Sequence, residues 1–243
     1  MYGGFSVAMI VRSAGLESSS GRPVSLACQF VRPLLVNHSV DIGVIAVRKG
    51  RSSELLRVSL MQSGKLAVEA LMRTSSATEG PECSSRSLDL GDPFSLRPTR
   101  EFTRKDGWER DPADLKLAEG RGNGVSTEAD HLYWLRFNDG LVYDDPFVEG
   151  ARIAFALDDQ GPAVLQRLGY MWGPKRKELP WGFTNLDMLV HFHKPRGTDW
   201  LCSVSDVTDG HNGIASAQSQ VWSRTGELLA TGLSQIAFFP RPG

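Results

Sequence analysis

Alternation of apolar and polar residues dominates the first third of the chain. Val, Leu and Ile recur there with a period near two between short turn signals, which is typical of half-buried strands. The segments with this pattern are 25–33, 40–48, 53–62 and 65–74. The Lys49-Gly50 and Ser63-Gly64 steps suit hairpin turns. The pattern therefore predicts four antiparallel strands.

A helix is predicted just before these strands. Val7, Ile10 and Val11 have the spacing of one apolar helical face, which indicates a helix over residues 5–14. Gly3 and Gly4 precede it, and residues without a Cβ let a backbone or ligand approach a helix N-terminus closely. Because the sequence starts directly before this helix, we expect that a strand of the first unit is missing.

The second half has a similar order of elements. Residues 146–168 have helical spacing, which Gly161-Pro162 should kink or split, and Gly169 suits a C-cap. Strands are predicted at 94–102, 131–137, 183–194, 200–207, 213–223 and 227–239. The polar, Gly-rich residues 105–128 are expected to form an exposed connection.

An internal repeat relates the two halves. Residues 30–33, Phe-Val-Arg-Pro, recur as Phe-His-Lys-Pro at 192–195, and Ser-Gly-Lys-Leu at 63–66 recurs as Thr-Gly-Glu-Leu at 225–228. Both correspondences have an offset of 162 residues (192 − 30 and 226 − 64). We interpret the chain as two copies of one α+β unit. The first spans 1–74, a linker spans 75–92, and the second spans 93–243.

Composition narrows the function classes. The chain has 243 residues, is 41% hydrophobic and carries a formal net charge of −1, so no basic field favours nucleic acid as a partner. Its three cysteines lack disulfide or metal-ligand spacing, which favours a reducing compartment and predicts a cytoplasmic protein. No stretch approaches the about 18 apolar residues of a membrane span, so none is expected.

Asp187 is the first candidate for chemistry. It is the only acidic residue in the apolar and aromatic stretch 184–195. A carboxylate inside a half-buried strand is costly unless it is paired or used. The structural alternative is a carboxylate that caps a turn or pairs with a nearby arginine.

Five motifs carry a resemblance to a known family. They are Met1-Tyr2-Gly3-Gly4, Gln29-Phe30-Val31-Arg32-Pro33, Gln62-Ser63-Gly64-Lys65, Leu186-Asp187 with Phe192-His193-Lys194-Pro195, and Gly226-Glu227-Leu228-Leu229-Ala230 with Gln235. They resemble the type II (TesB-like) acyl-CoA thioesterases, from residue 2 to the end except 75–92 and 105–128. The resemblance implies a double hotdog fold, in which each antiparallel sheet wraps a helix and the two sheets join edge to edge. It also implies hydrolysis of acyl-CoA or a related acyl thioester, with no cofactor and no metal.

The resemblance implies a catalytic set in the second copy. Members of the family use an Asp, a Thr or Ser, and a Gln to hold and activate one water. These positions fall on Asp187, the expected general base, on Thr208 and on Gln235. Ser205 or Asn212 could replace Thr208, and Thr208-Asp209-Gly210 could instead be a turn.

The repeat predicts the number of catalytic sites in the chain. Subtracting the offset places Ser25, Ala46 and Arg73 opposite the three catalytic positions, so we expect one site per fused pair. The first copy would contribute Gly3 and Gly4, whose helix N-terminus can present backbone N–H groups to the thioester carbonyl.

Several other features have simpler interpretations. His191 and His193 share a strand face, but no third ligand has recognisable spacing, so no metal is expected. The basic run 175–177 could contact the phosphates of CoA, although a solvated loop is the more usual explanation. Three tryptophans could line an acyl channel or pack between the sheets: Trp134, Trp172 and Trp181.

Alternative functions fit parts of the pattern. A non-catalytic hotdog protein that binds acyl thioesters is the main one. A hydratase or dehydratase typically needs an Asp-x-x-x-x-His pair, and Asp187 and His193 are one residue too far apart for it. Exposed sheet edges favour self-association, so we expect a homo-oligomer.

Overall fold

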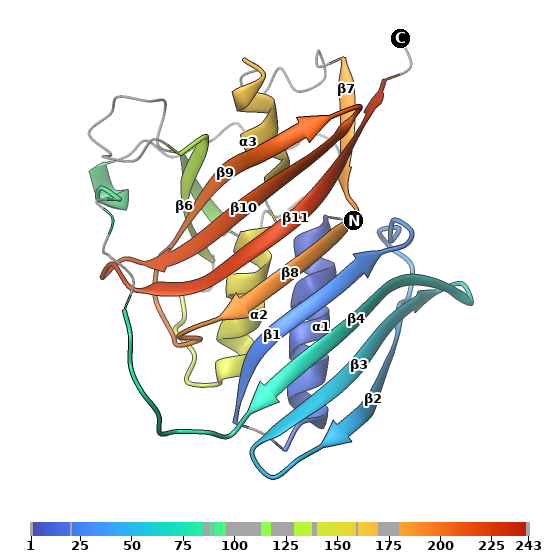
Figure 1. Ribbon diagram of the computed structural model, residues 1–243, viewed down its shortest axis with the longest axis vertical. Coiled ribbons are helices and arrows are strands. Elements are labelled where there is room, and N and C mark those ends of the chain that lie inside the picture. The colour runs from blue at the N-terminus through green and yellow to red at the C-terminus, as the bar shows by residue number, and fades with distance from the viewer. Residues whose placement is uncertain are drawn as a thin grey trace.

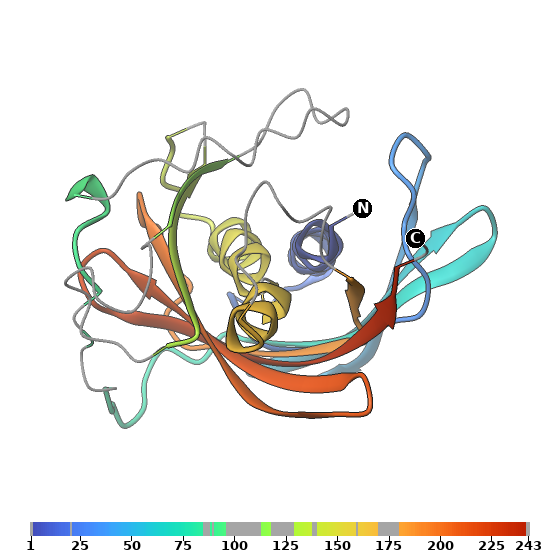
Figure 2. The same cartoon turned by 90° about the horizontal axis from the view of Figure 1, so that it is seen from above.

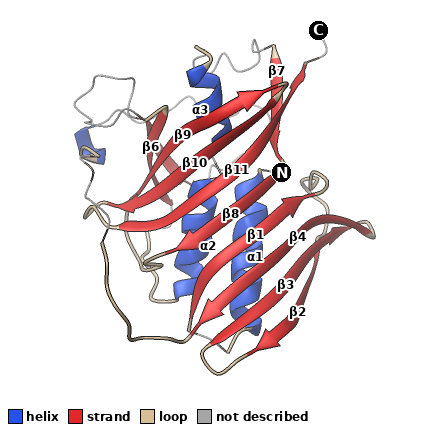
Figure 3. Ribbon diagram, in the orientation of Figure 1, coloured by secondary structure: helices blue, strands red, loops and turns tan. Residues whose placement is uncertain are grey.

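Two antiparallel helices lie in the concave face of one large sheet (Figures 1 and 2). The computed structural model describes residues 2–19, 21–84, 88, 90–95, 113–117, 129–137, 140–158, 160–169 and 180–241, with 113–117 as backbone alone. The helices are α1 (Gly3–Glu17), α2 (Pro146–Leu157) and the shorter α3 (Gln160–Arg167), with a 3-10 turn at Pro93–Ser95. Figure 3 shows the helices in blue against the red strands of this sheet.

The strands divide between the two repeats. The first contains β1 (Arg22–Phe30), β2 (Asp41–Lys49), β3 (Ser53–Gln62) and β4 (Lys65–Ser75). The second contains β5 (Ala113–Leu117), β6 (His131–Phe137), β7 (Trp181–Asn185), β8 (Asp187–Phe192), β9 (Leu201–His211), β10 (Ile214–Ser223) and β11 (Leu228–Pro240). The four strands predicted for the first repeat are all present.

The sheet runs continuously through both repeats. Its order is β2-β3-β4-β1-β8-β11-β10-β9-β6-β5, and β7 pairs with β11 beside this path. β1 and β8 form the junction, where Gln29 lies opposite Asp187 and Ser25 lies opposite His191. The two sheets therefore join edge to edge, as expected.

The core forms where the helices meet the inner face of the sheet. α1 buries Val7, Ile10, Val11 and Ala14 completely, which is the face that the sequence predicts. The α2 side chains Ile153, Ala154, Ala156 and Leu157 are also fully buried. Removing this apolar surface from water holds the helices against the sheet.

The helical stretch of the second repeat breaks earlier than predicted. The break lies at Asp158, between α2 and α3, and not at Gly161-Pro162. Pro162 is instead the third residue of α3, in its first turn, where its lack of an N–H costs no helical hydrogen bond. The early break leaves Asp158 as the C-cap of α2.

Three other predictions need correction. The strand expected over 183–194 is interrupted at Leu186, which separates β7 from β8. The connection expected over 105–128 contains β5, which extends the sheet beyond β6. The strand expected from Phe94 does not begin there, because Pro93–Ser95 forms a 3-10 turn, and residues 96–102 lie outside the described residues.

Candidate active site

The N-cap residue of α1 does not cap the helix with its side chain. Tyr2 is the N-cap residue and its side chain accepts no bond from the first turn. A helix N-terminus presents backbone N–H groups without helical partners and the positive end of the helix dipole. The first turn of α1 is therefore suited to an oxyanion.

Asp158 lies directly against this N-terminus. It follows α2, is only 5% exposed, and its Oδ1 accepts a hydrogen bond of 2.6 Å from Asn185 Nδ2 in β7. Its backbone oxygen accepts a 3.0 Å hydrogen bond from the Tyr2 hydroxyl. The two helices run antiparallel, so the end of α2 meets the start of α1.

Glycine lets the two helix ends approach closely. A Cβ at residue 3 would lie 2.6 Å from Asp158 Oδ2, and one at residue 4 would lie 2.9 Å from the Phe155 backbone oxygen. Contacts this short do not occur between real Cβ atoms and their neighbours. Gly3 and Gly4 thus allow the close backbone approach that the sequence suggests.

Ser234 is a buried polar neighbour of Asn185. Asn185 lies opposite Ile236 in β11, and Ser234 is two residues before Ile236 on the same inner face. Such diagonal neighbours are separated by about 7–8 Å. Ser234 is 4% exposed, and its hydroxyl has no hydrogen-bond partner in the described part of the chain. Ser234 is therefore a neighbour of Asn185, the residue that bonds Asp158.

Cys28 borders the same region but is not a nucleophile. Burial of its thiol raises its pKa strongly, and the negative charges of Asp158 and then Asp187 raise the pKa further. The thiol therefore stays protonated. The attacking group in this site must be something other than a cysteine thiolate.

Asp187 has a different environment from Asp158. It is partly buried at the start of β8, and its Oδ1 accepts a 2.8 Å hydrogen bond from the backbone N–H of Gln235. Leu186 donates its own N–H to the Gln235 oxygen over 2.8 Å. The carboxylate therefore satisfies a backbone donor beside the interruption between β7 and β8.

The structure brings Asp187 to the backbone of Gln235 but not to Thr208. The Gln235 side chain is exposed, whereas its neighbours Ser234 and Ile236 are buried, so strand alternation directs it to the outer face. Thr208 lies in β9, with β10 and β11 between it and β8, which is about 14 Å along the sheet. It is an exposed strand residue at a register shift between Val207 and Asp209, not part of a turn.

The two alternatives for the hydroxyl group also lie apart from Asp187. Ser205 is fully buried in β9, where its hydroxyl lies 2.8 Å from that of Ser219. Asn212 is an exposed residue of the β9–β10 turn, with a positive φ of 49°. Neither is placed beside Asp187 by the sheet order.

The histidine and tryptophan candidates from the sequence lie in the following environments. No cluster of three or more metal-ligating side chains occurs in the described ranges. His193 Nε2 lies 3.2 Å from the Thr231 hydroxyl, and burial, with His191 nearby, lowers the His193 pKa. Trp134 is buried and donates to the Leu90 oxygen, whereas Trp181 is partly exposed. Trp172 and residues 175–177 lie outside the described residues.

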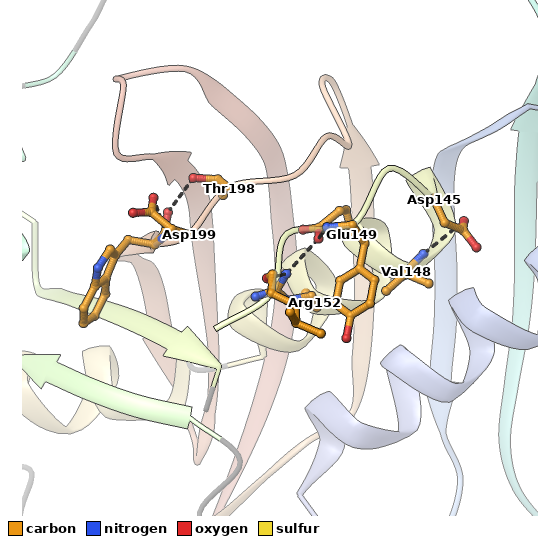
Figure 4. A network of polar contacts seen from close by, with 9 residues as sticks. Asp145, Val148, Glu149, Arg152, Thr198 and Asp199 are labelled. Atoms are coloured by element: carbon orange, nitrogen blue, oxygen red, sulfur yellow. Dashed lines mark hydrogen bonds and ion pairs between the residues drawn. The ribbon is translucent and has the colours of Figure 1, made fainter. Parts of the chain in front are cut away.

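At the opposite end of the helix pair, the N-terminus of α2 is capped and tightly packed. Asp145 caps α2 by accepting hydrogen bonds from the Phe147 and Val148 amides, at 2.8 and 3.3 Å (Figure 4). A Cβ at Gly15 would lie 2.5 Å from the Phe147 ring, so α1 packs tightly there. The α2 N-terminus thus has its first-turn amides bound by a side chain of the chain itself.

Asp158 was not among the residues that the sequence indicated. A signal for it does exist, because Asp158 interrupts the apolar run 153–157 just before Gly161-Pro162. The criterion that selects Asp187, a carboxylate next to buried apolar residues, applies equally to Asp158. Its proximity to Gly3 depends on the helix packing and has no signal in the sequence.

Comparison with solved structures identifies the fold. The acyl-CoA thioesterase II TesB2 of Mycobacterium marinum is 20% identical and has a TM-score of 0.77, covering 100% of this chain and 91% of that chain. The TesB protein of Mycobacterium avium subspecies paratuberculosis is 21% identical, with a TM-score of 0.76 and coverage of 99% and 88%. A hotdog-fold protein of unknown function from Alicyclobacillus acidocaldarius is 20% identical, with a TM-score of 0.77 and coverage of 99% and 88%. The chain is thus a double hotdog protein, as predicted.

Family models identify the family. The acyl-CoA thioesterase N-terminal domain matches residues 1–75, and the acyl-CoA thioesterase C-terminal domain matches residues 80–238. The chain belongs to the acyl-CoA thioesterase family and is a thioester hydrolase. The comparison with curated proteins found no match. None of the helices in the described ranges is long and apolar enough to cross a membrane.

Proposed function

We propose that this protein hydrolyses acyl-CoA or a closely related acyl thioester with a water molecule that a carboxylate activates. The observation that carries the proposal is the buried carboxylate of Asp158 against the N-terminus of α1, which the Tyr2 side chain does not cap. A base and a set of oxyanion donors are the two things that thioester hydrolysis requires. Both lie at one point of the molecule.

The chemistry follows from these groups. Asp158 takes a proton from water while the water oxygen forms a bond to the thioester carbonyl carbon. Negative charge develops on the carbonyl oxygen, and the amides of the first α1 turn stabilise it. The carbon–sulfur bond then breaks, the proton passes to the leaving thiolate, and the free acid remains. Asn185 holds the Asp158 carboxylate through Nδ2, and Ser234 supplies a hydroxyl to orient the water.

Asp187 is the second candidate for the base. The sequence predicts it in this role, with Thr208 and Gln235 as partners, and it lies near enough to Cys28 to affect the same thiol as Asp158. Its carboxylate already accepts the Gln235 amide. Asp158 is the better candidate because it is more deeply buried and contacts Gly3.

The test is thiol release from acyl-CoAs of short to long chain, with binding of the same esters measured in parallel. We expect turnover of at least part of this panel. Folded protein that binds acyl-CoAs without releasing thiol would overturn the proposal and favour the alternative, a non-catalytic acyl-thioester binding protein.

A further inference from the structure

A row of buried polar side chains crosses the inner face of the second repeat. His131 in β6, Ser205 in β9 and Ser219 in β10 lie opposite one another in adjacent strands. All three are at least 97% buried, since their exposed fractions are 3%, 0% and 1%. The Ser205 and Ser219 hydroxyls are 2.8 Å apart, and His131 Nδ1 lies 3.2 Å from Gln166 Oε1 in α3.

Two further polar groups of the second repeat are buried. They are Ser234 of β11 and Gln160, the first residue of α3. We call these five residues the polar belt: His131, Gln160, Ser205, Ser219 and Ser234. Leu157, before the break between α2 and α3, and Val164, after it, belong to different apolar clusters.

Gln160 and Ser234 lack the hydrogen bonds that the other three residues of the polar belt make. Gln160 is completely buried, and neither its amide oxygen nor its amide nitrogen has a partner among the described residues. The Ser234 hydroxyl also has no hydrogen-bond partner among the described residues. Buried polar groups are normally hydrogen-bonded, because leaving them unpaired destabilises the fold. These groups therefore indicate a polar partner that is not part of the described chain.

The polar belt is adjacent to the proposed reaction centre. Gln160 is two residues after Asp158, and Ser234 is the diagonal neighbour of Asn185. Gly232, opposite Ser219, has no side chain, and a Cβ there would lie 3.4 Å from Leu157 Cδ2. The polar belt therefore begins within two residues of the proposed base.

We infer that the acyl group of the substrate carries a hydroxyl or oxo oxygen, which the polar belt binds. The inference rests on the proposed thioester hydrolysis and adds the substrate class. A hydroxyl or oxo oxygen on the chain can accept from the Gln160 amide and from serine hydroxyls, and a hydroxyl can also donate. A site built to hydrogen-bond such a group discriminates against the analogue that lacks it, because its polar groups then stay unpaired.

The first experiment compares matched pairs of CoA esters of equal chain length: butanoyl with 3-hydroxybutanoyl, and hexanoyl with 3-hydroxyhexanoyl. We expect kcat/KM for the hydroxylated member to be larger by about tenfold or more. Equal or better hydrolysis of the unsubstituted esters would overturn the inference and leave the proposed hydrolysis standing. Release of thiol from none of the esters by folded protein would overturn both.

Two variants test whether the polar belt causes the preference. Gln160→Leu should bring the ratio of kcat/KM for the hydroxylated ester to kcat/KM for the unsubstituted ester close to one. The change should come mainly from lower activity on the hydroxylated ester. Gln218→Leu makes the same chemical change on the exposed face of β10, one residue from Ser219, and should leave the preference unchanged. Ser219→Ala is the milder variant if Gln160→Leu fails to fold. A preference that survives both belt variants would contradict the inference.

Discussion

The two ends of the α1–α2 pair are related positions with opposite chemistry. Asp158 is twelve residues after the first residue of α2, and Gly15 is twelve residues after the first residue of α1 (158 − 146 and 15 − 3). Asp158 places a carboxylate at the α1 N-terminus, whereas Gly15 lets the Phe147 ring pack against α1. One end therefore has a buried carboxylate against a helix N-terminus, and the other has a capped helix and an apolar contact.

This difference shows where the duplicated unit has diverged. The strands of both repeats pair in one continuous sheet, and both helices bury apolar faces against it. The helix ends differ in a cap, a glycine and one carboxylate.

The largest expected effect is loss of activity in Asp158→Asn. This change keeps the shape and the possible contact with Asn185 but removes the base, so we expect kcat/KM for thiol release to fall by about 10³-fold. Asp187→Asn is the matched variant and should lower it by about tenfold or less, since it weakens only the bond to the Gln235 amide. A larger loss in Asp187→Asn than in Asp158→Asn would assign the base to Asp187, as the sequence predicts.

Adding one methyl group at either end of the α1–α2 pair should affect activity at one end and stability at the other. Gly3→Ala places a Cβ 2.6 Å from Asp158 Oδ2, and we expect about a 10²-fold loss of kcat because the carboxylate must move. Gly15→Ala places a Cβ 2.5 Å from the Phe147 ring and should lower the free energy of unfolding by about 1–3 kcal/mol. Steady-state kinetics and urea unfolding of both variants give the comparison. Loss of activity in the folded Gly15→Ala variant alone would contradict the assignment of the site to α1.

Removal of the α2 cap should affect stability only. Asp145→Ala deletes the acceptor for the Phe147 and Val148 amides, and we expect the free energy of unfolding to fall by about 1 kcal/mol. The ion pair with Arg12 is exposed and adds little. Urea titration measures the loss, and Asp144→Ala in the same loop is the control. A marked change in kcat would show that the two ends are coupled.

The smallest effect concerns pH. Glu54 lies beyond the end of α1, where hydrogen bonds from Ser19 and then Ser18 lower its pKa below the ordinary 4.5. A carboxyl group whose pKa is lowered in the folded state stabilises the fold above its unfolded pKa, and this contribution disappears as pH falls through the folded pKa. Glu54→Gln should therefore flatten the acid-side decline in unfolding free energy below about pH 4.5. An unchanged acid profile would show that these bonds do not couple to folding.

The sequence by itself determined the duplicated α+β architecture, because apolar period and repeat offset are properties of the chain alone. It also determined which face of α1 is buried, and that glycines stand at the α1 N-terminus. These features depend on local spacing, which strand and helix geometry convert directly into structure.

The tertiary structure alone decided which carboxylate meets that N-terminus. Asp158 and Gly3 become neighbours only because α1 and α2 pack antiparallel, and the sequence has no signal for that distance. The same is true of Gln235, which strand alternation turns outward while Ser234 turns inward, and of Thr208, which the strand order separates from β8. A shift of one residue along a strand moves a side chain to the other face of the sheet, and two intervening strands move it away from a neighbour. Both the register and the strand order are set by long-range packing.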